Sequence, residues 1–205
     1  DEITVLHRET PSSVPSFSPV VVHPPPTPEK IEKISPPLLP LAEVNANARA
    51  ATVNVFCTRT DSPLDVIASG SGVLVSGDGA ILTNAHVAQY FLLDTLADCV
   101  IRTGAPARNA YRAELVYLPP RWVEENKHLI SKETAEATGE RDFAFLRIVG
   151  STASFPHLTP ETALEIRGTT TSVLVTGYSG GFLGGAALLR DLYLSSAQAT
   201  IQKIY

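Results

Sequence analysis

The chain has 205 residues, a net charge of -5 and 44% hydrophobic residues, which suits one folded domain with a tail. It contains no run of Lys or Arg. A nucleic-acid partner would need a basic stripe to neutralise its phosphates, so nucleic-acid binding is disfavoured. The apolar runs are all shorter than the roughly 18 residues that cross a bilayer as a helix, so the sequence predicts no membrane-spanning helix.

Residues 1–42 differ in composition from the rest of the chain. Ten of the 16 prolines lie between Pro11 and Pro40. Because proline fixes its own φ and lacks a backbone N–H, this segment predicts a polyproline-like or disordered tether. Such a tether often connects a membrane anchor to a folded domain. We therefore expect either a membrane anchor N-terminal to the chain or a plain tail.

From Asn45 onward, short strands with turn residues between them dominate the pattern. Residues 69–87 indicate two strands around the turn Gly77-Asp78-Gly79, and a short helix is expected over 85–94. Residues 120–137 indicate a surface helix that leaves Trp122 exposed. Further strands are predicted at 51–58, 98–103, 111–118, 141–149, 170–178 and 199–205. The absence of βα alternation favours an all-β barrel over a doubly wound sheet.

The two cysteines, Cys57 and Cys99, each lie in a predicted strand. Their spacing matches no zinc or redox motif. One interpretation is two buried thiols. The other is a disulfide between two strands of one barrel, which would require an oxidising compartment.

Two motifs contain residue types suited to acyl transfer. His86 lies in Thr83-Asn84-Ala85-His86-Val87, at the end of a predicted strand, and Asp142 opens the alternating strand of residues 141–149. Histidine is the side chain whose pKa starts near working pH, and a carboxylate on its other ring nitrogen would fix its tautomer. Both side chains are predicted at the rim of a barrel. The remaining histidines, His7, His23, His128 and His157, are expected in solvent.

These motifs resemble those of trypsin-like serine proteases, especially the bacterial HtrA-like branch. The match is carried by residues 83–87 and by Arg141-Asp142-Phe143-Ala144-Phe145-Leu146, and residues 45–185 follow the family in order. The resemblance implies a chymotrypsin-like double barrel. Residues 43–150 would form the first barrel, and residues 151–205 a linker with the incomplete start of the second.

Ser179, in Gly177-Tyr178-Ser179-Gly180-Gly181, matches two nucleophile templates. The α/β-hydrolase elbow requires a histidine after the serine, and none follows here. In trypsin-like proteases the aspartate-to-serine gap is about twice the histidine-to-aspartate gap, whereas here it is the shorter one. We therefore interpret Ser179 as part of a glycine turn and expect the nucleophile beyond Tyr205, or lost.

The resemblance implies a serine endopeptidase that acts on polypeptides, with His86 as general base and then general acid and Asp142 orienting it. It implies no cofactor or metal and an extracytoplasmic location. This piece alone is expected to be inactive. Two alternatives stay open: a catalytically dead, protease-like binding module, and a structural extracytoplasmic domain in which the His86–Asp142 pair is accidental.

Overall fold

The structure is a computed structural model that describes residues 39–128, 139–160, 172–180 and 183–201. All of these belong to one compact unit, Leu38–Tyr205. The predicted tether up to residue 38, the end of the helix expected over 120–137 and the last residues of the strand expected over 199–205 lie outside the described residues.

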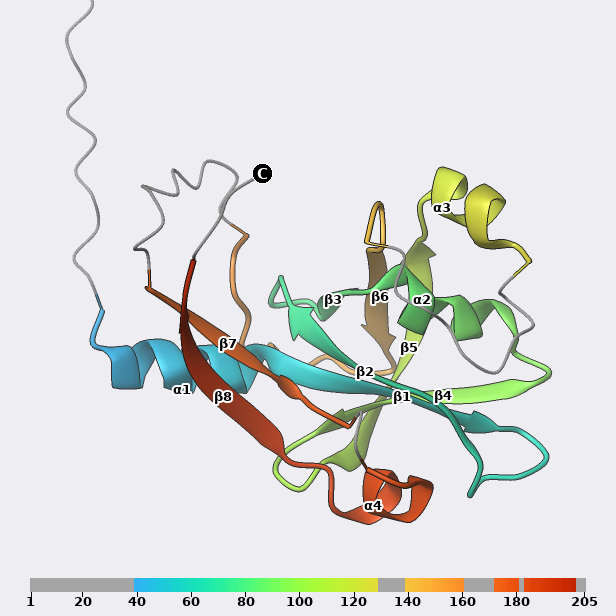
Figure 1. Cartoon of the computed structure of the whole chain (residues 1–205), viewed down its shortest axis with the longest axis horizontal. Helices are drawn as coiled ribbons and strands as arrows, with labels where there is room; N and C mark the ends of the chain where they lie inside the picture. Colours follow the sequence, from blue (N-terminus) through green and yellow to red (C-terminus); the bar gives the residue numbers. More distant parts are fainter. Residues whose placement is uncertain (1–38, 129–138, 161–171, 181–182, 202–205) are drawn as a thin grey trace, which may run out of the picture. The chain divides into compact units, whose positions relative to one another are not determined.

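Six antiparallel strands close into a barrel (Figure 1). Around the barrel their order is β1-β2-β3-β6-β5-β4, and β4 pairs with β1 to complete the circle. The all-β barrel expected from the strand pattern is therefore confirmed. The strands are β1 (Thr52–Arg59), β2 (Val66–Leu74), β3 (Ala80–Thr83), β4 (Ala97–Thr103), β5 (Arg108–Tyr117) and β6 (Ala144–Val149).

The barrel interior is filled by branched and aromatic side chains. Strand β1 is buried along almost its whole length, which suits its β-branched sequence TVNVFCTR. The turn between β2 and β3 requires Gly79, whose φ is +89° and whose position leaves little room for a Cβ beside Ile148 and Phe155. The main cluster comprises Ala51, Val53, Val55, Leu74, Ile81, Val87, Ala88, Ile101, Ala144, Leu146, Ile148 and Phe155.

Helices are short, and two of them differ from expectation. Helix α1 (Leu41–Ala51) precedes the barrel where strands were expected from residue 45. Helix α3 covers Pro120–Asn126, and its Trp122 is 1% exposed rather than at the surface. The other helices are α2 (Ala85–Ala88), the 3-10 helix η1 (Gln89–Leu92) and α4 (Gly185–Arg190).

Strands β7 (Ser172–Tyr178) and β8 (Leu194–Thr200) form a separate two-stranded antiparallel sheet. The backbone N–H of Tyr178 donates to the Ser71 hydroxyl of β2 at 2.9 Å, and the Tyr178 hydroxyl donates to the Gly104 carbonyl at 2.8 Å. From α1, the Arg49 guanidinium donates to the Leu194 carbonyl at 3.1 Å. These bonds attach the sheet to the barrel wall.

Helix α4 is attached to the barrel by Arg102, which is 2% exposed. Its guanidinium donates to the carbonyls of Leu188 and Leu189 in α4 and to that of Ala107. It also lies 4.3 Å from the centre of the Phe56 ring. Three carbonyl acceptors and an aromatic face thus compensate the desolvation of a charge that forms no ion pair with a carboxylate of the described residues.

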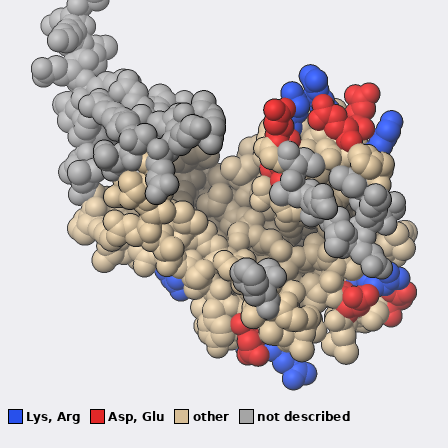
Figure 2. Space-filling model, in the orientation of Figure 1, with Lys and Arg blue, Asp and Glu red and all other residues tan. Residues whose placement is uncertain are grey.

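On the face drawn in Figure 2, blue and red side chains lie in mixed groups at the periphery, without a basic stripe. This distribution agrees with a sequence that contains both acidic and basic residues and no run of Lys or Arg. Among the described helices, none combines the length and the apolar character needed to cross a membrane.

Candidate active site

Strand pairing brings His86 and Asp142 together. Strands β3 and β6 are antiparallel, with Thr83 opposite Ala144, so the chain leaving β3 meets the chain entering β6. His86 lies in α2, two residues past the helix cap Asn84, and Asp142 lies two residues before β6 begins. Two residues 56 positions apart in the sequence therefore become neighbours at the barrel rim.

The pair is joined by two hydrogen bonds that use both carboxylate oxygens. His86 Nδ1 lies 2.6 Å from Oδ2 of Asp142, and the backbone N–H of His86 donates to Oδ1 at 2.9 Å. The Asp142 side chain is 6% exposed and that of His86 is 23% exposed. A buried carboxylate at Nδ1 favours the tautomer with its proton there, which leaves Nε2 as the basic nitrogen.

Neighbouring residues hold the loop that presents Asp142. Asn84 donates from Nδ2 to the Asp142 carbonyl at 3.1 Å. Arg141 has a φ of +55°, unusual for a residue with a side chain, and its carbonyl accepts the N–H of Phe143 at 2.9 Å. This tight turn directs the carboxylate toward α2. Asn84 is part of the TNAHV motif, but its contact with the aspartate loop was not predicted.

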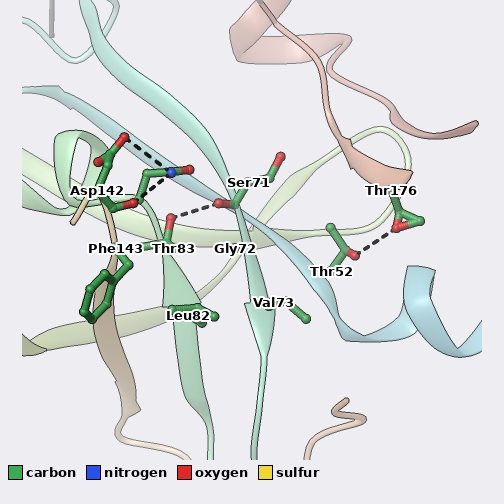
Figure 3. A pocket seen from close by; sticks show the side chains of 10 residues that line it. Thr52, Ser71, Gly72, Val73, Leu82, Thr83, Asp142, Phe143 and Thr176 are labelled. Carbon is green, nitrogen blue, oxygen red and sulfur yellow. Dashed lines mark hydrogen bonds between the residues drawn. The ribbon is translucent and has the colours of Figure 1, made fainter. Parts of the chain in front are cut away.

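A pocket of about 330 Å³ adjoins Asp142 on the side of β2 and β3 (Figure 3). Thr176 of β7 and Thr52 of β1 line one side of it, with their hydroxyl oxygens joined at 3.4 Å, and Asp142 lies on the other side. The lining combines polar and apolar residues and also includes Ser71, Gly72, Val73, Leu82, Thr83, Asn84 and Phe143. The pocket thus lies between the barrel and the β7–β8 sheet, beside the carboxylate that orients His86.

Ser179 is flanked by residues that contact the turn between β4 and β5 and helix α4. It follows the last residue of β7 and is exposed. Its neighbour Tyr178 contacts Gly104, and a Cβ at Gly180 would meet Leu188 of α4. Among the hydrogen bonds of the described residues, none joins Ser179 to His86. His128 and His157 are exposed, as expected, whereas His7 and His23 lie outside the described residues.

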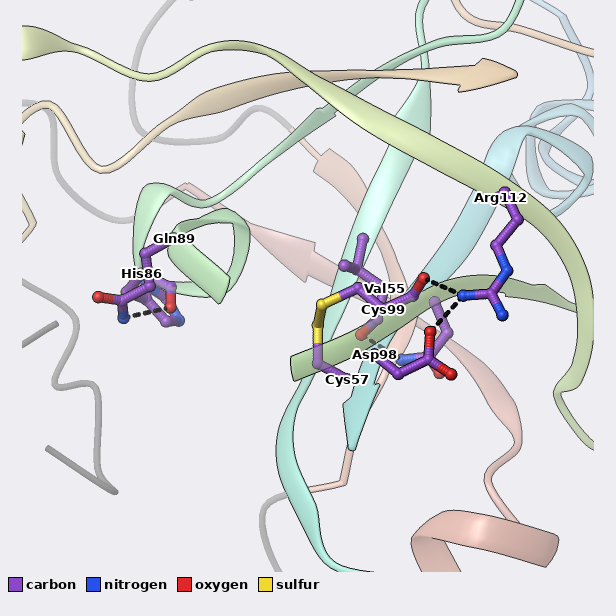
Figure 4. The surroundings of a disulfide bond; sticks show 8 residues. Val55, Cys57, His86, Gln89, Asp98, Cys99 and Arg112 are labelled. Carbon is purple, nitrogen blue, oxygen red and sulfur yellow. Dashed lines mark hydrogen bonds and ion pairs between the residues drawn. A yellow bond between two sulfur atoms is a disulfide. The ribbon is translucent and has the colours of Figure 1, made fainter. Parts of the chain in front are cut away.

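Cys57 and Cys99 form a disulfide between β1 and β4 (Figure 4). The two residues are directly opposite each other in the antiparallel register. Buried Tyr90 of η1 packs against the same cluster, together with Ala97. The disulfide therefore supports the 3-10 helix that immediately follows α2, the helix of His86.

Within the described part of the chain, no group of three His, Cys, Asp or Glu side chains is placed to hold a metal ion. The chemistry that the His86–Asp142 arrangement offers is proton transfer. An imidazole with one nitrogen held by a carboxylate can take a proton at the other nitrogen and return it.

Comparisons with known proteins bear on the family and the fold of the chain. The family model of the trypsin-like peptidase domain matches residues 70–203. Among solved structures, 139 chains match this one. One of them is the crystal structure of Deg5, with a TM-score of 0.50 and 16% sequence identity. That match covers 78% of this chain and 60% of the Deg5 chain. A comparison with curated proteins gives no match. The trypsin-like, HtrA-like fold implied by the sequence resemblance is confirmed.

Proposed function

Because this chain belongs to the trypsin-like peptidase domain family, we propose that it carries the proton-transfer half of a serine endopeptidase. The observation that supports this most directly is the double hydrogen bond between His86 and Asp142, at 2.6 and 2.9 Å. In the proposed reaction, Nε2 of His86 takes the proton of a serine hydroxyl as its oxygen attacks the peptide carbonyl. The same nitrogen then donates that proton to the leaving amine, while Asp142 stays ionised.

The serine itself is proposed to lie outside these 205 residues. The residues on either side of Ser179, Tyr178 and Gly180, face Gly104 and α4, and the aspartate-to-serine spacing of the family places the nucleophile further along. The chain also spans only 60% of the length of Deg5. The activity is therefore a property of a longer protein containing this chain, with polypeptides as substrates.

An extracytoplasmic location is part of the proposal. The Cys57–Cys99 disulfide favours an oxidising compartment, since disulfides are rare in proteins of the reducing cytosol. The proline-rich residues 1–42 would then serve as a spacer from a membrane anchor preceding the chain.

The test uses the longer protein and a serine-directed phosphonate probe. We expect covalent labelling of one serine beyond residue 205, loss of labelling in the His86→Ala variant, and hydrolysis of a denatured polypeptide by the unmodified protein. Labelling that survives His86→Ala would contradict the proton-transfer role. Absence of both labelling and hydrolysis, with the fold intact, would favour a catalytically dead, protease-like binding module.

A further inference from the structure

A buried glutamine next to the histidine of the site has one half of its amide paired and the other half unpaired. Gln89, the first residue of η1, is 1% exposed. Its Nε2 donates to the backbone carbonyl of His86 at 2.7 Å (Figure 4). Its Oε1 is buried and has no hydrogen-bond partner among the described residues.

The orientation of this amide is fixed by its neighbour. If the amide were reversed, Oε1 would face the His86 carbonyl oxygen at the same short distance, and two acceptors would repel each other. The NH₂ group must therefore point to His86, and the oxygen is left without a donor from the described residues. A buried acceptor without a partner destabilises a fold, whereas an apolar side chain of similar shape would not. What the glutamine offers over an apolar residue is therefore confined to its one hydrogen bond to the His86 carbonyl.

The hydrogen bond lies at the junction between two kinds of helix. The N–H of Gln89 donates to the Ala85 carbonyl, which ends the α-helical ladder of α2, and η1 continues as a 3-10 helix. The carbonyl of His86 is the next one along, and the Gln89 side chain supplies its donor. His86 bonds Asp142 through its ring and through its backbone N–H. It is also held through its backbone carbonyl, by Gln89.

The other end of this connection is firmly anchored. Tyr90, which follows Gln89, packs with the Cys57–Cys99 disulfide and Ala97 in one buried cluster. The cluster fixes η1 against β1 and β4. The Gln89 amide is therefore held in a fixed position relative to the His86 carbonyl.

We propose that Gln89 is a positioning residue for the His86–Asp142 pair. Its amide fixes the His86 backbone so that the imidazole stays on the Asp142 carboxylate. The importance of Gln89 for catalysis rests on the proposed function. Its effect on the position of the His86 imidazole can be measured without any catalysis.

The experiment compares Gln89→Leu with a matched control in the ¹⁵N-labelled 205-residue chain. Asn126→Leu is the control, because Asn126 is also buried and its Nδ2 donates at 2.8 Å to a carbonyl of its own helix, that of Trp122. The readouts are the imidazole ¹⁵N shifts of His86, which report its tautomer, and the exchange rate of its backbone N–H. Thermal unfolding is measured alongside.

In Gln89→Leu we expect loss of the single Nδ1–H tautomer and exchange of the His86 N–H about tenfold faster, with only a small change in thermal stability, because loss of the donor to the His86 carbonyl and removal of the unpaired Oε1 oppose each other. In Asn126→Leu we expect lower stability and unchanged His86 signals. In the longer protein, Gln89→Leu should lower kcat and leave KM unchanged.

Unchanged His86 signals in folded Gln89→Leu would overturn the proposal, and so would equal changes in the two variants. Gln89→Met is the second variant, since it keeps the length of the side chain. Failure of both Gln89 variants to fold would also overturn the proposal, because it predicts that apolar substitution is tolerated. If the longer protein hydrolyses no peptide, the proposed function fails while the NMR result still decides the role of Gln89.

Discussion

Asp142 holds His86 at two points, accepting from the backbone N–H with one carboxylate oxygen and contacting ring Nδ1 with the other. Asp142→Asn keeps the first contact but places an NH₂ group opposite Nδ1. That nitrogen must then act as acceptor, so the ring proton moves to Nε2, where no further proton can be taken up. We expect peptide hydrolysis by the longer protein to fall about 10⁴-fold.

The control for this prediction is Asp61→Asn. Asp61 also pairs with a basic side chain, that of Arg59, but it is 73% exposed. Hydrolysis by this variant should match that of the unmodified protein. A similar loss of rate in the two variants, or a rate kept by Asp142→Asn, would contradict the assigned role of Asp142.

The sequence predicted the strands of the barrel because their patterns are local. Alternation in residues 141–149 and the Asp78-Gly79 turn are visible in any short window. Helix α1 was missed because the alanine-rich residues 41–51 were not separated from the β-branched run that begins at Thr52. Trp122 was misplaced because a seven-residue helix carries too few positions to reveal which face is buried.

The pairing of His86 with Asp142 was expected from their sequence motifs, whereas their catalytic role stays a prediction. His86 and Asp142 were found because their flanking residues follow a known pattern. The roles of Gln89 and Ser71 depend on contacts that no spacing rule describes. The Gln89 side chain bonds back to the preceding helix, and the Ser71 hydroxyl bonds to a strand residue 107 positions away. The signal for Gln89 was only a polar residue three positions after the histidine, among apolar neighbours.

The Cys57–Cys99 disulfide should stabilise the barrel appreciably. It closes a loop with a sequence separation of 42 residues. The double substitution Cys57→Ala/Cys99→Ala should lower the free energy of unfolding by about 2–4 kcal/mol. Urea denaturation measures the loss, and reduction of the unmodified protein should reproduce most of it. Denaturation curves that coincide with and without reductant would show that the bridge adds no stability.

Because Gly70 has no side chain, Val87 on the helix of His86 can pack closely against strand β2. A Cβ at this position would lie 2.6 Å from a methyl of Val87. Gly70→Ala must therefore displace the Val87 side chain or α2 itself, and we expect a loss of about 1–3 kcal/mol in stability together with weakened His86–Asp142 contacts. The matched control is Gly184→Ala, where a Cβ would meet nothing within 4 Å. Thermal unfolding and the His86 imidazole signals should change only in Gly70→Ala, and equal behaviour of the two variants would refute the steric argument.

Two serines near β7 should differ in importance. Ser179 is exposed, so Ser179→Ala should change stability by less than about 0.5 kcal/mol and leave phosphonate labelling of the longer protein intact. Ser71→Ala removes the acceptor of the Tyr178 N–H and should cost about 1 kcal/mol. Loss of labelling in Ser179→Ala would identify Ser179 as the nucleophile after all.

Stability should fall in alkaline solution because two tyrosines are buried. Burial raises the pKa of Tyr90 and that of Tyr178, although Arg102 and Arg49 partly oppose the shift at Tyr178. The folded state therefore keeps these protons to a higher pH than the unfolded chain does. Above about pH 10 the unfolded state binds fewer protons, so the free energy of unfolding decreases as the pH rises.

Tyr90→Phe removes one of these two groups and should flatten the decrease, by up to about 1.4 kcal/mol per pH unit within the window between the unfolded and folded pKa. Urea denaturation between pH 8 and 11 measures the slope. Tyr193→Phe serves as the control because Tyr193 is 55% exposed, and its slope should match that of the unmodified protein. If the curves of the two variants run parallel throughout, ionisation of Tyr90 does not cause the alkaline loss of stability.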